Sequence, residues 1–200
     1  MPQETKNPIE ERRSIRKYKQ QMVTKEQIEQ IIHAAALAPS AKNRQPWKYI
    51  VYTEAEKQKL LEAMEIGLQK EQKNHTLLPQ SAFGLPDAFH TLTVMREAPV
   101  LIIVMNTNGK SPYEPVNSDE RLAEICDSLS IGASIENLLL KATELGLGTL
   151  WIANTCFAYD DLMAAIQSDG QLIGAVALGY ADEQPSQRPR KELNDILEYR

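Results

Sequence analysis

Residues 38–51 read APSAKNRQPWKYIV and join a polar loop to the start of a strand. The loop carries hydroxyl, amide and carboxamide groups between Pro39 and Pro46, and the two prolines restrict its backbone. The following WKYIVYT, residues 47–53, is rich in aromatic and β-branched residues, which favours a strand. A stiff polar loop of this kind can hydrogen-bond a planar heterocycle, but from its chemistry alone an ordinary helix-to-strand connection is the better interpretation.

Helices and strands alternate on both sides of this loop. Thr24 and Gln27 form a capping box at the start of a helix expected over 24–38. Ser118 is expected to cap the longest helix, which Gly146 ends. Further helices are expected at 7–18, 54–68, 118–145 and 159–168, and further strands at 99–105, 149–153 and 172–180. The pattern predicts an α/β or α+β fold whose sheet of four or five strands has helices on both faces.

No composition shift divides the chain, so we expect one domain over residues 1–200. The stretch 69–98 has no steady period, and its prolines and Gly84 predict an irregular insertion or lid with one helix near Phe89–Arg96. Within that stretch, His90 is a candidate for lining a substrate pocket. The tail 185–200 is expected to be extended and is basic at its start.

The composition argues against several classes of function. The chain has 22 Lys and Arg against 27 Asp and Glu, a net charge of -5, whereas general nucleic-acid and anionic-membrane binders are more often basic. The cysteines and histidines do not have the spacing of metal ligands. The longest apolar run, 99–105, is too short to span a bilayer, and no apolar secretory signal is visible. We therefore expect a cytoplasmic protein without metal, membrane or nucleic-acid partners.

Positive charge is concentrated in RRSIRKY, residues 12–18. Arg12, Arg13 and Arg16 would lie within an arc of about 100° if this segment were helical. Guanidinium groups suit phosphate because of their planar, forked donors. The cluster therefore indicates an anion site, although a solvated surface face is also compatible with the composition.

Four segments in order resemble the nitroreductase family of FMN-dependent oxidoreductases. They are RRSIRKY at 12–18, APSAKNRQPWKYIV at 38–51, LGLGTLWI at 145–152 and GYADEQPSQRPRKEL at 179–193. The resemblance covers 8–68 and 99–195. It implies an α+β three-layer sandwich, with a mixed, mainly antiparallel sheet flanked by helices. It also implies an intertwined homodimer with FMN at the subunit interface and the small-residue helix segment 130–137 in the dimer core.

The resemblance also implies which residues bind FMN. The motif for the phosphate and the pyrimidine edge is matched by Arg12, Arg13, Ser14 and Arg16, and a loop supplied by the partner subunit is matched by Pro39, Ser40, Ala41, Asn43 and Gln45. The strand end beside the isoalloxazine ring is matched by Thr149, Leu150, Trp151 and Ile152. The tail pair that closes on the phosphate and ribityl chain is matched by Arg188 and Arg190. The resemblance assigns no catalytic side chain, and it leaves Arg44 facing solvent.

The activity implied is transfer of hydride from NADH or NADPH through tightly bound FMN to nitroaromatic, quinone or similar electron-poor acceptors, by a ping-pong mechanism. The chain has no GxGxxG motif, so the nicotinamide would dock directly over the flavin. Many family members have an acidic residue beside the strand end, where this chain has Ile152 and Ala153. Two alternatives stay open: a flavoenzyme of the same fold that dehalogenates, fragments flavin or oxidises heterocycles, and a non-catalytic flavin-binding module.

Overall fold

The computed structural model describes residues 7–200. Its helices are α1 (Pro8–Glu11), α2 (Lys25–Ala36), α3 (Glu54–Asn74), α4 (Leu85–Glu97), α5 (Ser118–Glu144) and α6 (Tyr159–Ile166). Its strands are β1 (Trp47–Tyr52), β2 (Val100–Asn106), β3 (Gly148–Ile152) and β4 (Gln171–Gly179). Short 3₁₀ turns lie at Ala41–Asn43, Pro79–Gly84, Asn154–Ala158 and Leu193–Asp195.

The four strands form one sheet in the order β1-β2-β4-β3, and every neighbouring pair is antiparallel. The predicted α+β class with a mainly antiparallel sheet is confirmed. All seven residues of β2 are buried, which fits its continuous apolar sequence and its central place. β3 lies at one edge of the sheet, so one side of its backbone remains open to other partners.

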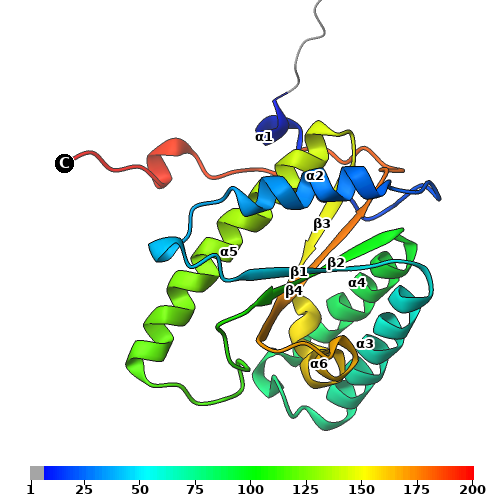
Figure 1. The fold of residues 1–200 in the computed structure, drawn as a ribbon, viewed down its shortest axis with the longest axis vertical. Helices are drawn as coiled ribbons and strands as arrows, with labels where there is room; N and C mark the ends of the chain where they lie inside the picture. Colours follow the sequence, from blue (N-terminus) through cyan, green and yellow to red (C-terminus); the bar gives the residue numbers. More distant parts are fainter. Residues whose placement is uncertain (1–6) are drawn as a thin grey trace, which may run out of the picture.

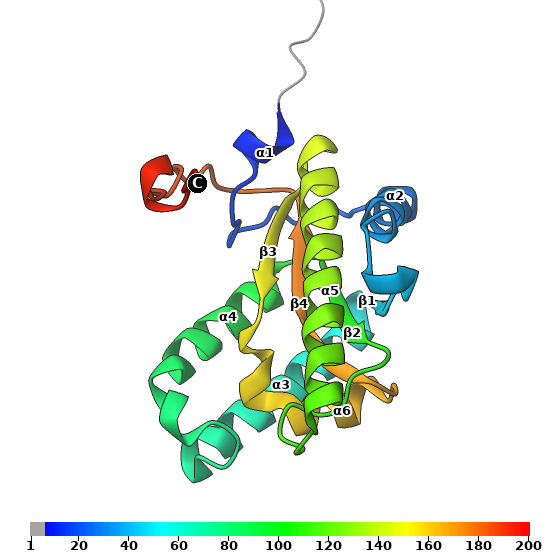
Figure 2. The same ribbon diagram turned by 90° about the vertical axis from the view of Figure 1, so that its left-hand side faces the viewer.

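Helices cover both faces of the sheet, which gives three layers (Figures 1 and 2). Because side chains alternate along a strand, Leu101 and Ile103 of β2 face α3, α4 and α6, whereas Ile102 and Val104 face α2 and α5. The apolar core is thereby divided into two clusters, one on each side of the sheet. Long α5 crosses the sheet and ends next to the start of β3.

Three local expectations were wrong. α1 ends at Glu11, and the segment 12–16 is extended, because Ser14 pairs with the edge of β3 instead of continuing a helix that would crowd three arginines. Asn117, not Ser118, caps α5, through a capping box with Glu120. The stretch 69–98 is largely helical: α3 extends to Asn74, and α4 follows a 3₁₀ turn.

Glu71 fixes the chain reversal after α3. Its carboxylate is buried, with a residue exposure of 2%, and accepts hydrogen bonds from the backbone amides of Thr76, Leu77 and Leu78 at 2.8–2.9 Å. Burial alone would raise the pKa of Glu71, but these backbone hydrogen bonds, together with the Thr76 hydroxyl, outweigh it and hold the pKa below its ordinary value. The ionised carboxylate therefore stabilises the turn that leads into α4.

We predict that Glu71→Gln lowers the free energy of unfolding by about 1–3 kcal/mol, because an amide would face backbone donors that need an acceptor. Urea denaturation at neutral pH measures the change. Glu62→Gln is the matched control, since Glu62 is exposed on the same helix, and it should change stability little.

The same variant should show a defined pH dependence. A carboxyl whose folded pKa is lowered contributes stability above its unfolded pKa, and that contribution is lost as the pH falls through the folded pKa. The stabilities of wild type and Glu71→Gln should therefore converge below the ordinary carboxyl value of 4.5. A constant difference down to strongly acid pH would contradict this role of the ionised group.

Candidate functional site

The arginine segment lies along the open edge of β3. Ser14 pairs with Thr149 in parallel, and the amide of Ile15 donates to the carbonyl oxygen of Thr149 at 2.9 Å. Gly148 permits this close approach, because a Cβ there would lie 2.7 Å from the side chain of Ile15. The buried Tyr18 hydroxyl donates to the carbonyl of Ile15 at 2.7 Å. The segment is thus held in extended form against the sheet.

The C-terminal tail begins beside the same segment. The amide of Lys19 donates to the carbonyl of Tyr180, and the amide of Asp182 donates to that of Lys17, both at 2.9 Å. The Glu183 carboxylate accepts from the amides of Arg16 and Lys17. These bonds bring together two segments that are more than 160 residues apart in the sequence.

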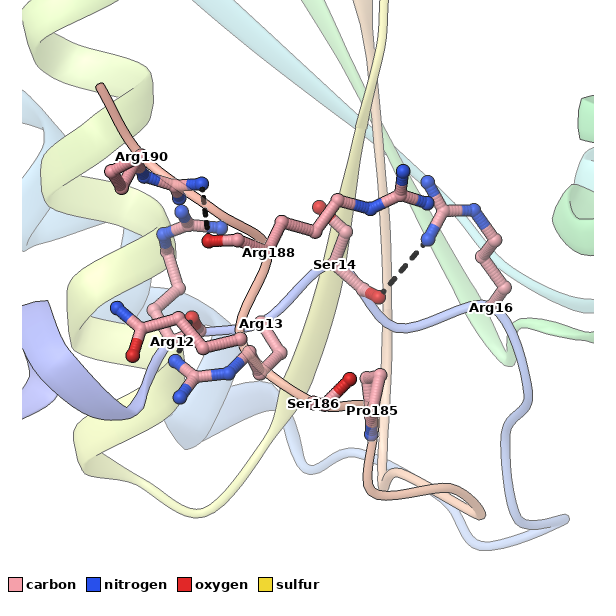
Figure 3. Close-up of a pocket in the computed structure, with 9 residues that line it drawn as sticks. Arg12, Arg13, Ser14, Arg16, Pro185, Ser186, Arg188 and Arg190 are labelled. Atoms are coloured by element: carbon pink, nitrogen blue, oxygen red, sulfur yellow. Dashed lines mark hydrogen bonds between the residues drawn. The ribbon is translucent and has the colours of Figure 1, made fainter. Parts of the chain in front are cut away.

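The two segments enclose a pocket of about 150 Å³ (Figure 3). It is lined by Arg12, Arg13, Ser14 and Arg16 from the first segment and by Pro185, Ser186, Gln187, Arg188 and Arg190 from the tail. The side chain of Arg188 extends from the tail toward Arg16. The structure therefore brings the two predicted arginine groups into one site.

This pocket has a large excess of positive charge. Within residues 7–200, Arg12 alone of its five arginines has an acidic partner, Glu136, at 3.4 Å. Arg13 donates instead to the backbone carbonyls of Glu10 and Arg12, at 2.6 and 2.8 Å. Like charges gathered in this way repel one another, and a bound anion relieves the repulsion. Of the ligands for such a pocket, a phosphate group offers the best match to several guanidinium forks.

A second pocket, of about 240 Å³, adjoins the first, and Arg16 lines both. The end of β3 and the residues after it, Leu150 to Asn154, form one wall. The other wall is a face of α4 whose members are spaced one helical turn apart: Asp87, His90, Thr91 and Val94. His90 is exposed and lines this pocket, as its sequence position suggested. The missed face of α4 could have been found from its helical spacing, had 85–97 been recognised as a helix.

Asn154 joins the two walls of the second pocket. Its Nδ2 donates to Thr91 Oγ1 at 2.9 Å and to Asp87 Oδ2 at 3.1 Å. Its Oδ1 is the one buried side-chain polar atom in residues 7–200 without a hydrogen-bond partner. A buried acceptor without a donor is costly, so this wall has one unfilled hydrogen-bonding position. Nothing in the sequence distinguished Asn154 from any other loop asparagine.

The backbone of β3 presents polar groups to the same region. The carbonyl of Thr149 points to the outer edge, where it accepts from Ile15. Since successive residues of a strand direct their amides to opposite edges, the amide of Trp151 also faces outward. The Trp151 side chain is 43% exposed, whereas Leu150 and Ile152 are buried in the core that includes α4. The predicted strand-end residues thus lie where the arginine segment ends.

The fourth predicted group lies elsewhere in the same chain. The loop after α2 packs on the middle of α5, on the side away from β3 (Figure 2). The amide of Ala41 donates to Ser130 Oγ of α5 at 3.2 Å. None of its predicted site residues lines either pocket: Pro39, Ser40, Ala41, Asn43 and Gln45. One chain therefore brings together three of the four predicted groups and leaves this loop apart.

Arg44 is exposed, as expected, but its guanidinium is also paired with an acid of α5. Its Nε and Nη2 donate to Oδ1 of Asp127 at 2.9 and 2.6 Å, and Asp127 is buried in α5. On either side of Arg44 the backbone is unusual, because Lys42, Asn43 and Gln45 have φ of 54°, 54° and 49°. Left-handed backbone costs a residue other than glycine about 1–3 kcal/mol and persists only where its surroundings enforce it.

Two features are absent from residues 7–200. No group of three or more His, Cys, Asp or Glu is placed there to hold a metal ion. In the same range, no helix combines the length and the apolar character needed to cross a bilayer.

The family profile described as "Nitroreductase family" matches residues 9–180. The chain belongs to the nitroreductase family. This nitroreductase-family chain is 30% identical over 183 residues to a protein of Archaeoglobus fulgidus provisionally named NADH dehydrogenase/NAD(P)H nitroreductase, covering 86% of this chain and 83% of the relative. It is 26% identical over 190 residues to the Bacillus subtilis protein YfhC, provisionally named an NAD(P)H nitroreductase, covering 94% and 89%. The family and these relatives identify it as an oxidoreductase.

Solved structures agree with this family fold. A BluB-like flavoprotein of Clostridium difficile is 27% identical, with a TM-score of 0.71 and 96% of each chain covered. The FMN-dependent nitroreductase of Mycobacterium smegmatis, solved in complex with NADPH, has a TM-score of 0.77 at 19% identity, covering 97% of this chain and 96% of the other. The second likeness supports the fold alone.

Proposed function

We propose that this nitroreductase-family chain is an FMN-dependent oxidoreductase. Electrons pass from NADH or NADPH to nitroaromatic, quinone or similar electron-poor acceptors, in a ping-pong scheme in which donor and acceptor use one site in turn. The observation that carries the proposal is the arginine-lined pocket that continues, through Arg16, into the pocket at the end of β3.

The donors and acceptors of the two pockets fit FMN. The five arginines of the first pocket, with one carboxylate among their partners, suit a phosphate that carries about two negative charges. The second pocket combines apolar side chains with the Arg16 guanidinium, the outward amide of Trp151 and the unpartnered acceptor of Asn154. A flavin has an apolar ring and a pyrimidine edge that bears both carbonyl oxygens and an N–H, so each polar group has a counterpart.

Different residues of the two pockets would bind different parts of this cofactor. Arg12, Arg13, Arg188 and Arg190 would hold the phosphate, and Arg16 and Ser14 would lie between phosphate and ring. Bound FMN supplies the redox chemistry itself, because its ring accepts and returns hydride. Positive charge from Arg16 near the pyrimidine edge favours the reduced, anionic form of the cofactor. Under this proposal no side chain of the protein needs to act as acid or base.

The loop at 39–45 fits a role in trans, as part of the site of a second subunit. It points away from both pockets of its own chain and is held on α5. Nearby, α5 exposes an apolar stripe at helical spacing: Leu122, Ile125 and Leu129 are 62%, 48% and 71% exposed. A second copy of the chain packed on this stripe would cover it, and an intertwined homodimer would complete each site. Cytoplasmic location and the lack of nucleic-acid and membrane partners stay predictions.

The first test is an absorbance spectrum of the purified protein, before and after NADPH or NADH is added without oxygen. We expect flavin bands that bleach with the reduced nicotinamide and return when menadione or nitrofurazone is added. Retained bands would indicate a non-catalytic flavin-binding module. Bleaching without recovery by either acceptor would favour a different reaction on the same fold. A protein that binds no FMN after reconstitution would contradict the proposal outright.

Arg16→Glu should raise the dissociation constant for FMN by at least about 100-fold, since a repulsion replaces an attraction that adjoins both pockets. Quenching of flavin fluorescence on titration with apoprotein measures the constant. Lys19→Glu is the control, because it makes the same charge reversal three residues away on an exposed side chain that lines neither pocket. Equal affinities in the two variants would mean that the phosphate site lies elsewhere.

His90→Phe tests the wall of the second pocket. Among residues 7–200 no hydrogen bond occupies the imidazole, so it is free to donate to a nitro or quinone oxygen at the pocket mouth. The variant should raise KM for menadione by about 5- to 10-fold, the value of one hydrogen bond, with FMN affinity unchanged. Ferricyanide, which needs no pocket for electron transfer, should be reduced at the wild-type rate. An unchanged menadione KM would remove His90 from the acceptor site.

A further inference from the structure

We propose that Asp127 is a positioning residue for the cofactor, acting on the loop 39–46 through Arg44. In this proposal the ion pair holds the loop in the one conformation that binds FMN across the subunit interface. The inference rests on the proposed function, because it assumes that this loop contacts FMN in the partner's site. It concerns residues that the family resemblance does not assign.

The loop needs an external hold because its own backbone is unfavourable. Lys42, Asn43 and Gln45 all have left-handed φ values within four residues. Short-range bonds inside the loop offset part of this cost. The amides of Asn43 and Arg44 donate to the carbonyls of Ser40 and Ala41 at 2.9 and 3.1 Å. Ser40 Oγ accepts from the amide of Gln45 at 3.0 Å, and Gln45 Nε2 donates to Asn43 Oδ1 at 3.1 Å. A free loop of this sequence would relax to other conformations, so contacts outside it must enforce this one.

One turn of α5 supplies those contacts at both ends of the loop. Ser130 Oγ accepts from the amide of Ala41 at the start, and it donates to the carbonyl of Cys126 at 2.7 Å. Asp127 Oδ1 accepts twice from Arg44 near the end. The spacing of Asp127 and Ser130 places both on the same helix face. The turn therefore acts as a two-point clamp on residues 41 and 44.

The Asp127 carboxylate is buried and held in place by a second hydrogen bond. Its side chain is 5% exposed, and its other oxygen accepts from Asn108 Nδ2 at 3.3 Å. The loop after β2 thus orients the carboxylate while α5 carries it. A buried carboxylate without its cation is strongly unfavourable, so the loop cannot leave without exposing or protonating Asp127. Asp127 touches neither pocket, and its effect on the cofactor passes through Arg44.

The test compares FMN affinity in Asp127→Asn and Arg44→Met with that in the wild-type protein. Asp127→Asn keeps the size of the side chain, Arg44→Met keeps an unbranched apolar stem without the guanidinium, and both remove the ion pair. We expect the dissociation constant for FMN to rise about 10-fold or more in each, and to rise no further in the double variant, because both act on one contact. Arg121→Met is the matched control: Arg121 also pairs with an acid of α5, Glu124, but on the exposed surface.

Two further readouts separate positioning from general stability. The melting temperature of the Asp127→Asn apoprotein should stay near that of wild type, because this variant leaves no buried charge unpaired. The rise in its melting temperature on adding FMN should shrink. Mixed dimers of an Arg16→Glu protomer with an Asp127→Asn protomer should have one site with both defects and one site with neither. Such dimers should bind FMN at half of their sites with wild-type affinity.

The outcomes distinguish this inference from the proposed function. Unchanged FMN affinity in both variants would overturn the positioning role while leaving the proposed function intact. In Asp127→Asn, loss of affinity in step with an equal loss of apoprotein stability would also overturn it, since the pair would then be a general structural contact. Mixed dimers without a wild-type site would show that the loop serves its own protomer. A wild-type protein that binds no FMN would remove the proposed function itself.

Discussion

The hydrogen bond from the amide of Ile15 to the carbonyl of Thr149 determines where the rest of the site lies. It adds the arginine segment to the open edge of β3, and the start of the C-terminal tail then pairs with the residues that follow. The start of the tail forms its backbone hydrogen bonds with residues 17–19, so its position depends on that of the arginine segment. The absence of a side chain at Gly148 is what lets the first contact form.

The sheet could be predicted because its strands are strongly patterned. The apolar run of β2 and the β-branched and aromatic residues of β1 specify strands by composition alone. The prediction was poorer where tertiary contacts override local signals. The stretch 69–98 was expected to be irregular, yet buried Glu71 supplies acceptors for the backbone amides of the turn, so that α4 can start directly after Pro79–Gly84. A buried acceptor of this kind cannot be recognised from spacing.

The arrangement of the candidate site could be predicted in part, although the roles of its residues stay predictions. Arginines at 12–16 and 188–190 were expected to act together, and they line one pocket. The face of α4 and Asn154 were missed, because their roles arise from packing between elements that are distant in the sequence. The ion pair of Arg44 was also missed: the residue is exposed, as expected, but the acid that it binds lies 83 positions away in α5.

The arginine pocket is made from the two ends of the described chain, residues 12–16 and 185–190. An anion held by both segments is therefore a reversible cross-link between the beginning and the end of the fold. Because the two halves of the pocket come together only in the folded chain, such a ligand binds the folded form alone and shifts the folding equilibrium by mass action. The persistence of the folded chain in a cell would thereby be coupled to the supply of any anion that this pocket binds.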